Sequence, residues 1–282
     1  MPTDYQEVRR DLESVLTLAS DLSIAASSRS VVEWHLEYAS HIFLKVYCHA
    51  NSALRLSPTG LSQAMPGATE VWDLGSTCAV VRALIDTYFA MYYVAVESIS
   101  SEERDFREAS WCFEGEHDRL WMLQRIGSDS PELAGLEAEV GRLRGLVLNH
   151  PVYGRLDKEM QRQIRDGKKP FHLSNSALAE RSEISVNYYR AVYRYLSSYT
   201  HTYPYSVSQL ARIRAGDPEA LGLFSTALQY CLAFLAVAVL DFWSLFPDLA
   251  VSCDPHTQKV LNVWVSIAAE VGVTCPPDSL HL

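Results

Sequence analysis

The sequence predicts an all-α fold, a bundle-like single domain that spans residues 1–282. Apolar residues recur at helical spacing along nearly the whole chain, and alternating runs of useful strand length are absent. Glycine and proline are modest in number, at 13 and 12 of 282 residues. Because no internal repeat or flexible linker divides the chain, one helical domain is the simplest account. The plausible seams lie near residues 57–70 and 150–175.

Start and stop signals bound the expected helices. The break Ser57-Pro58-Thr59-Gly60 follows the second helix. Ser100 and Glu103 have the spacing of a capping box at the start of the fourth helix, and Pro131 suits the first turn of the next. Pro204 ends the tyrosine-rich helix. In order, we expect helices at residues 4–26, 31–56, 76–97, 100–125, 130–148, 155–166, 176–182, 185–200, 207–214, 218–246 and 256–271.

Composition and charge limit the partners of the chain. The sequence is 48% hydrophobic and 21% charged, which is typical of a globular protein, and its formal net charge is -10. An acidic protein is a poor non-specific ligand for nucleic acid or for an anionic membrane. We therefore expect no DNA partner, and any RNA site would have to be a local basic patch.

Cysteine usage and hydropathy indicate a cytoplasmic protein that does not enter a membrane. The six cysteines are far apart and form no CxxC pair, and the N-terminus carries acids where a secretory signal needs bases. The longest apolar run, Tyr230 to Leu240, has eleven residues and is followed by Asp241. A membrane-spanning helix needs about 20 apolar residues. We predict a buried core helix there and no disulfides.

The pair Arg194 and His201 is the most informative candidate site. The two residues are seven positions apart, nearly two helical turns, so both side chains leave one face of the helix. Ser198 lies one turn before the histidine and Tyr203 follows it. A cation beside an imidazole can bind or cleave a phosphodiester. The same histidine can also serve only to complete a helix C-terminus.

The spacing Arg-x6-His followed by x-Tyr resembles the signature of the HEPN superfamily (higher eukaryotes and prokaryotes nucleotide-binding). That superfamily consists of small helical proteins and includes metal-independent ribonucleases. The resemblance implies that Arg194 and His201 act on RNA, with Ser198 and Tyr203 as supporting groups. It also implies a homodimer, because the site is usually completed across two subunits. Tyr195 departs from the pattern, in which a polar residue such as asparagine commonly follows the arginine.

A second resemblance covers residues from about 40 to 210. The sequence contains His49-Ala50-Asn51-Ser52, Arg82 to Asp86, Glu103 to Arg107 and Tyr193 to His201, in that order. This order is similar to an uncharacterised family of bacterial helical proteins. It implies a fold and a recurrent polar cluster, here Arg82, Asp86, Arg107 and His201, but no activity.

The residues of this cluster also allow simpler interpretations. Arg82 and Asp86 lie one turn apart in an apolar helix, either as a buried ion pair or on the solvated edge of that helix. Arg107 stands in a charge-rich turn beside Glu103 and Glu108, which favours a solvated residue over a ligand contact.

Metal and DNA sites have weaker sequence support. Glu114 and His117 form the one evident Glu-x-x-His, and Glu37 and His41 share a face without that signature, whereas a di-iron bundle needs two such motifs and two more glutamates. We therefore predict no metal and no cofactor. Residues 176–185 have the rhythm of a helix-turn-helix, but Glu183 occupies the turn where glycine is favoured, and tyrosines fill the next helix.

Two functional hypotheses follow. The first is a HEPN-like, metal-independent endoribonuclease of a toxin or defence type. The second is a non-catalytic helical binding or scaffold protein whose polar cluster is structural or binds an anion. Burial discriminates between a structural cluster and a binding site, because an enclosed cluster with all hydrogen bonds made internally is structural, whereas a cleft open to solvent indicates a ligand.

Overall fold

A computed structural model of the chain describes residues 4–29, 33–58, 72–214 and 217–270. These residues form helices and, within the described ranges, no strand, so the predicted all-α class is confirmed. They cluster into two compact units, which we call unit 1 (residues 1–96 and 175–282) and unit 2 (residues 97–174). Unit 2 is therefore one continuous insertion in the chain of unit 1. The single-domain organisation stays a prediction. Of the two expected seams, that at 150–175 reaches a unit boundary, and that at 57–70 lies mostly outside the described residues.

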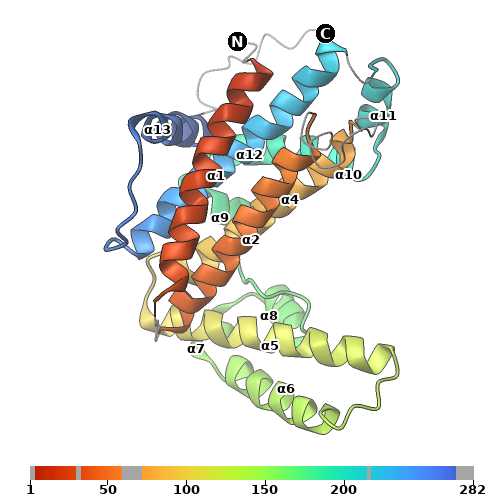
Figure 1. Ribbon diagram of the computed structural model, residues 1–282. Coiled ribbons are helices and arrows are strands. Elements are labelled where there is room, and N and C mark those ends of the chain that lie inside the picture. The colour runs from red at the N-terminus through yellow and green to blue at the C-terminus, as the bar shows by residue number, and fades with distance from the viewer. Residues whose placement is uncertain (1–3, 30–32, 59–71, 215–216, 271–282) are drawn as a thin grey trace. The chain divides into compact units, whose positions relative to one another are not determined.

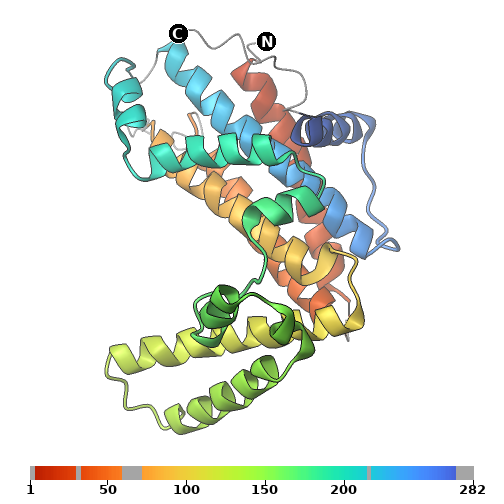
Figure 2. The ribbon, with the colours of Figure 1, turned by 180° about the vertical axis from the view of Figure 1, so that it is seen from behind.

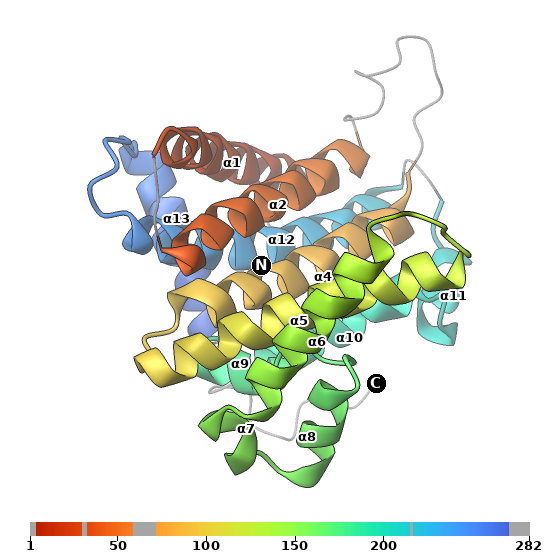
Figure 3. The same ribbon diagram turned by 90° about the horizontal axis from the view of Figure 1, so that it is seen from below.

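Unit 1 is built around one apolar helix. Helix α12 packs against α1, α2, α4 and α13, and α10 packs against α4 (Figures 1 and 2). Seen from below, α1 and α2 lie side by side (Figure 3). The helices of this unit are α1 (Tyr5–Ser27), α2 (Trp34–Leu56), α4 (Leu74–Met91) with a π-helical continuation (Tyr92–Val96), α9 (Asn175–Arg181), α10 (Val186–Thr200), α11 (Pro204–Leu210), α12 (Pro218–Leu245) and α13 (Pro255–Glu270).

Helix α12 is central because its sequence is apolar on all sides. Every residue from Cys231 to Val239 is buried, which confirms the predicted core helix, and the Phe242 ring stacks on that of Phe43 at 3.9 Å between centroids.

Two helical segments, Leu74–Val96 and Pro218–Leu245, are long and apolar enough to cross a membrane, and 61% and 72% of their most apolar stretches are buried within the structure. The core helices of soluble proteins pass the same test. The expected absence of a membrane, like the cytoplasmic location, stays a prediction.

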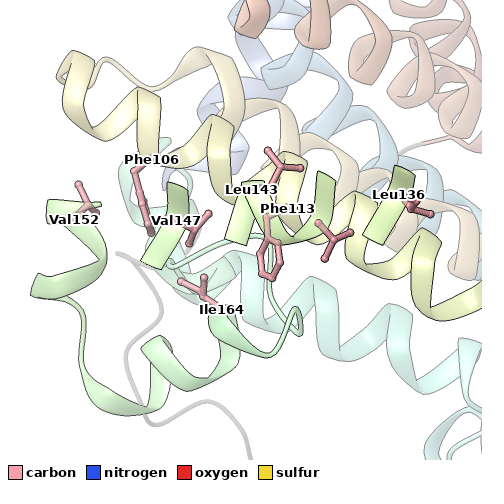
Figure 4. Packing of buried hydrophobic residues seen from close by; sticks show 8 residues of the cluster. Phe106, Phe113, Leu136, Leu143, Val147, Val152 and Ile164 are labelled. Carbon is pink, nitrogen blue, oxygen red and sulfur yellow. The ribbon is translucent and has the colours of Figure 1, made fainter. Parts of the chain in front are cut away.

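Unit 2 contains a helical hairpin and two short helices. Its helices are α5 (Ser101–Arg125), α6 (Leu133–Leu148), α7 (Pro151–Arg155) and α8 (Lys158–Arg165). Phe106 and Phe113 of α5 pack against Leu143 and Val147 of α6, and Ile164 of α8 completes the cluster (Figure 4). The unit thus has a hydrophobic core of its own.

Several helix ends follow the predicted signals, and two differ. The Ser100 hydroxyl accepts from the Glu103 N–H at 3.2 Å, as a capping residue does. The helix expected at 155–166 begins only at Lys158, where Asp157 caps α8, and a separate short helix, α7, begins before it at Pro151. The helix expected at 207–214 lies at Pro204–Leu210 instead. Pro204 occupies its first turn, where the missing N–H costs nothing.

The cysteines agree with the expected absence of disulfides as far as the structure describes them. Cys48, Cys78, Cys112, Cys231 and Cys253 are all free thiols. Cys78 and Cys231 are buried in apolar surroundings, where burial raises the thiol pKa of each to about 12. Cys275 lies outside the described residues.

We expect Gly167→Ala to destabilise unit 2 by roughly 2 kcal/mol or more. Gly167 has φ +63°, and a Cβ placed there would lie 2.2 Å from Nδ1 of His117. The substitution therefore adds a steric clash to a left-handed backbone that costs about 1–2 kcal/mol by itself. Urea unfolding followed by circular dichroism would measure the loss.

Gly127→Ala is the matched control for this prediction. Gly127 has φ +67°, and a Cβ placed there would have no other group within 4 Å, so its substitution reports the backbone cost alone. Equal losses of unfolding free energy in the two variants would show that a clash with His117 does not contribute to the cost of Gly167→Ala. The double variant His117→Ala/Gly167→Ala should recover the difference between them.

Candidate functional site

Two residues of helix α4 face α10 and α9 rather than each other. No ion pair within 4.0 Å joins Arg82 to Asp86, although both are described and both are partly buried. Arg82 contacts His201, and Asp86 contacts Asn175 and Tyr193. The expected i,i+4 ion pair is therefore not formed. Packing of α4 against α9 and α10 gives each side chain a partner outside its own helix, while both side chains stay partly exposed.

The Arg82 guanidinium is held at the end of α10. Its Nη1 lies 2.6 Å from Nε2 of His201, and its Cζ lies 4.8 Å from the centroid of the Tyr193 ring, a cation–π distance. Because a guanidinium only donates, Nε2 of His201 must accept, which places the imidazole proton on Nδ1. Nε of Arg82 is buried and has no hydrogen-bond partner among the described residues.

Asp86 supports the aromatic wall behind Arg82. Its carboxylate accepts from the Asn175 side-chain amide at 3.1 Å and from the Tyr193 hydroxyl at 3.3 Å. Burial raises the pKa of Asp86, while the Arg82 charge and these two hydrogen bonds oppose the rise. Asp86 therefore positions Tyr193, on whose ring Arg82 rests.

Helix α10 presents Arg194 and brings His201 to its C-terminus. Both residues line one pocket. His201 is the C-cap residue of α10, and its backbone N–H donates to the Ser197 carbonyl at 3.0 Å, while its imidazole contacts Arg82. The Cζ of Arg194 lies 5.8 Å from the centroid of the Tyr203 ring. Its side chain is exposed, as is that of His201.

Ser198 has an internal role in addition to its place beside the site. It is buried, its hydroxyl donates to the Arg194 carbonyl at 2.9 Å, and its own carbonyl accepts from the Ser206 hydroxyl at 2.7 Å. The contact with Ser206 joins α10 to α11. The hydroxyl of Ser198 is therefore already used as a donor within the protein.

The pocket that joins these residues, which we call the basic pocket, contains arginines without acids. It has a volume of about 370 Å³ and opens to solvent. Within the described residues, no carboxylate lies within 4.0 Å of the guanidinium groups of Arg82, Arg190 or Arg194, and none lines the pocket. Its lining residues are Arg82, Ser176, Tyr189, Arg190, Tyr193, Arg194, Ser197, His201 and Tyr203.

A second pocket, which we call the tyrosine pocket, adjoins the first. Its volume is about 710 Å³, and it shares Arg194 and Tyr203 with the basic pocket. Its lining residues are Ala191, Arg194, Tyr195, Ser198, Tyr203, Pro204 and Tyr205.

Arg107 has charged partners of its own within unit 2. Its guanidinium lies 2.7 Å from the Glu97 carboxylate and 2.9 Å from that of Glu103. His172 lies 3.2 Å from the same carboxylate of Glu103. The expectation that Arg107 is solvated is wrong, because its side chain is 1% exposed. A buried cation needs partners of opposite charge, and these two glutamates supply them.

The weaker sequence candidates have structural explanations. Among the described residues, no group of three or more His, Cys, Asp or Glu side chains comes together as a metal site. His117 packs on the Phe113 ring and against Gly167, while Glu37 and His41 are exposed on α2. Glu183 has φ +60° in the turn between α9 and α10, so it adopts the backbone that a glycine would favour.

Sequence reasoning missed Arg190 and Ser176. Arg190 lies one turn before Arg194 and its Nε lies 3.4 Å from the Ser176 hydroxyl. The spacing of Arg190, Arg194 and His201 was visible as a stripe on one helix face. Ser176 offered no comparable signal, because it reaches the pocket only through the packing of α9 against α10.

Comparison with known proteins adds no relative: no protein-family model, no curated protein and no solved structure matches the chain. The helical fold is compatible with both resemblances, which otherwise rest on their short motifs.

Proposed function

We propose that this chain binds a small oxyanion, with phosphate as the simplest example, in the basic pocket. One observation carries the proposal: three arginines without carboxylate partners and one histidine line a pocket that is open to solvent. The chain is acidic, with 34 Asp and Glu against 24 Lys and Arg, so unpaired arginines in one place need a reason. Like charges that line one pocket repel one another, and a bound anion reduces that cost.

The donors of the pocket match an oxyanion. Guanidinium groups donate paired hydrogen bonds to phosphate oxygens, and such charge-assisted bonds are the strong ones in proteins. Arg190 and Arg194 extend from α10, and Arg82 approaches from α4. The Nδ1–H of His201 is a further donor, because Arg82 occupies Nε2.

Metal-independent cleavage of RNA is the second candidate function, and one observation favours it. Arg194 and His201, the residues that the HEPN resemblance implies, line the same pocket. Acid–base catalysis would also require an imidazole nitrogen that accepts a proton. With Nε2 bound by Arg82 and the proton on Nδ1, His201 can donate but cannot accept until Arg82 moves. The arrangement therefore supports binding more directly than cleavage.

Titration calorimetry with inorganic phosphate tests the proposal. We expect saturable binding by the unmodified protein and a loss of about 10- to 100-fold in affinity in Arg82→Ala and in Arg194→Ala, because a charge-assisted hydrogen bond contributes about 1.5–3 kcal/mol. Arg55→Ala is the control, since Arg55 is an exposed arginine of α2 that does not line the pocket. No saturable binding, or equal affinity in Arg194→Ala, would refute the proposal.

The same variants decide the second candidate. Cleavage of a mixed RNA pool in excess EDTA, lost in Arg194→Ala and His201→Ala, would favour the ribonuclease. If the RNA stays intact with the unmodified protein and with both variants, and phosphate binds, the non-catalytic binding function is the one supported. Light scattering tests the expected homodimer, because a composite ribonuclease site requires two chains.

A further inference from the structure

We infer that the ligand is a phosphate ester that carries a planar ring, with its phosphate in the basic pocket and its ring in the tyrosine pocket. The inference rests on the proposed function, because it assigns the basic pocket to the anion. It goes further by naming the chemical class of the ligand. The ligand would be an organic phosphate rather than a free ion.

The two pockets are neighbours, because they share two lining residues. Arg194 and Tyr203 line both, so they stand between the two spaces. A free phosphate ion needs only the smaller space of about 370 Å³. The larger space of about 710 Å³ lies within the range of pockets that bind small molecules. An ester group attached to the phosphate would extend past Arg194 into this space.

Aromatic rings dominate the larger pocket. Tyr195, Tyr203 and Tyr205 line it, and Tyr203 and Tyr205 remain 42% and 50% exposed. The Tyr205 ring meets Tyr199 edge-on at 6.3 Å between centroids. A planar group laid on these rings would remove aromatic surface from water and add stacking of about 0.5–1.5 kcal/mol beyond the area buried.

Arg194 suits both halves of such a ligand. Its guanidinium donates to an oxyanion in the basic pocket, and it already lies near the Tyr203 ring, at 5.8 Å between Cζ and the centroid. Ser198 lines the tyrosine pocket beside it, but its hydroxyl proton is committed to a backbone carbonyl. The other polar groups of the tyrosine pocket belong to Arg194 and to the three tyrosines that line it.

Calorimetry with three probes tests the inference: inorganic phosphate, cyclohexyl phosphate and phenyl phosphate. Cyclohexyl phosphate has a ring of the same size that is not planar. We expect phenyl phosphate to bind about three- to tenfold more tightly than cyclohexyl phosphate, which corresponds to the stacking contribution. Tyr205→Ala should remove that ratio, whereas Tyr205→Phe, which keeps the ring, should retain it.

The outcomes separate this inference from the proposed function. If inorganic phosphate binds, but phenyl phosphate and cyclohexyl phosphate bind with equal affinity, the role of the tyrosine pocket is refuted and the proposed oxyanion site is supported. If no probe binds, the proposed function fails first. If phenyl phosphate binds more tightly than cyclohexyl phosphate, adenosine 5′-monophosphate and phosphotyrosine are compared next as two natural ligands of this chemical class. The natural ligand is expected to bind more tightly than phenyl phosphate and to lose that additional affinity in Tyr205→Ala.

Discussion

Replacing Arg107 by methionine should destabilise unit 2 by about 3–5 kcal/mol. The substitution keeps much of the apolar stem but removes a cation that is 1% exposed and lies within 3 Å of two carboxylates, at 2.7 Å from Glu97 and 2.9 Å from Glu103. Removal of one partner from a buried ion pair leaves charge without compensation, which costs several kcal/mol. We expect hydrogen exchange along α5 to accelerate, together with a lower urea midpoint.

Arg155→Met is the matched control for this result. Arg155 also forms an ion pair of 2.7 Å, with Glu102, but the side chains of the pair are 61% and 46% exposed. Exposed ion pairs contribute about 0–1 kcal/mol to stability, so the urea midpoint of this variant should lie close to that of the unmodified protein. Similar losses in Arg107→Met and Arg155→Met would mean that burial does not set the strength of the Arg107 contacts.

Replacing Asp241 by asparagine should stabilise unit 1 above neutral pH. Asp241 of α12 accepts from the Tyr88 hydroxyl at 2.8 Å, and burial, with a smaller contribution from Glu183, raises its pKa from 3.8 to about 6. A pKa raised in the folded state means that the folded protein binds the proton more tightly than the unfolded chain. The stability that this proton provides is fully present below pH 3.8 and is lost as the pH rises through about 6.

Asparagine cannot ionise, so the variant should lack this decline. A pKa difference of this size corresponds to at most ~3 kcal/mol, and partial solvent contact of Asp241 reduces the expected gain to about 2 kcal/mol at pH 8. Thermal unfolding at pH 4 and pH 8 measures it: the two proteins should agree at pH 4 and separate at pH 8. The exposed acid Glu180, changed to glutamine, is the control. A separation that is equal at both pH values would exclude ionisation as the cause.

The sequence predicted the helices well because each carries its own local signal. The run from Tyr230 to Leu240 is apolar on all sides and lies mostly buried in α12, and Ser100 caps α5. The start of α11 was predicted three residues too late, because proline commonly follows one helix and commonly begins another, and Pro204 does both. Thr202, with φ +56°, shows where the chain turns between α10 and α11, and no rule for threonine predicts that conformation.

The site was harder to predict because its contacts join distant segments. The pair Arg194 and His201 was visible as helix spacing, but Arg82 is 119 residues from His201 and meets it only when α4 packs on α10. Arg107 shows the same limit. Its place next to Phe106 on the buried stripe of α5 was visible, whereas its partner Glu97 lies outside that helix. The density of charged residues around Arg107 in the sequence therefore predicted a solvated side chain, whereas the side chain is buried.

The contacts of Arg107 have a consequence for how unit 2 is carried in the chain. Glu97 is the first residue of the unit and His172 is close to its last, and both belong to the cluster that Arg107 and Glu103 complete. The unit therefore ties its own two ends together with its own side chains, and it has its own hydrophobic core. Segments of this kind are the ones that proteins tolerate as insertions. In evolutionary terms, unit 2 could be gained, exchanged or lost as a cassette, while the residues of the basic pocket, all in unit 1, stay in place.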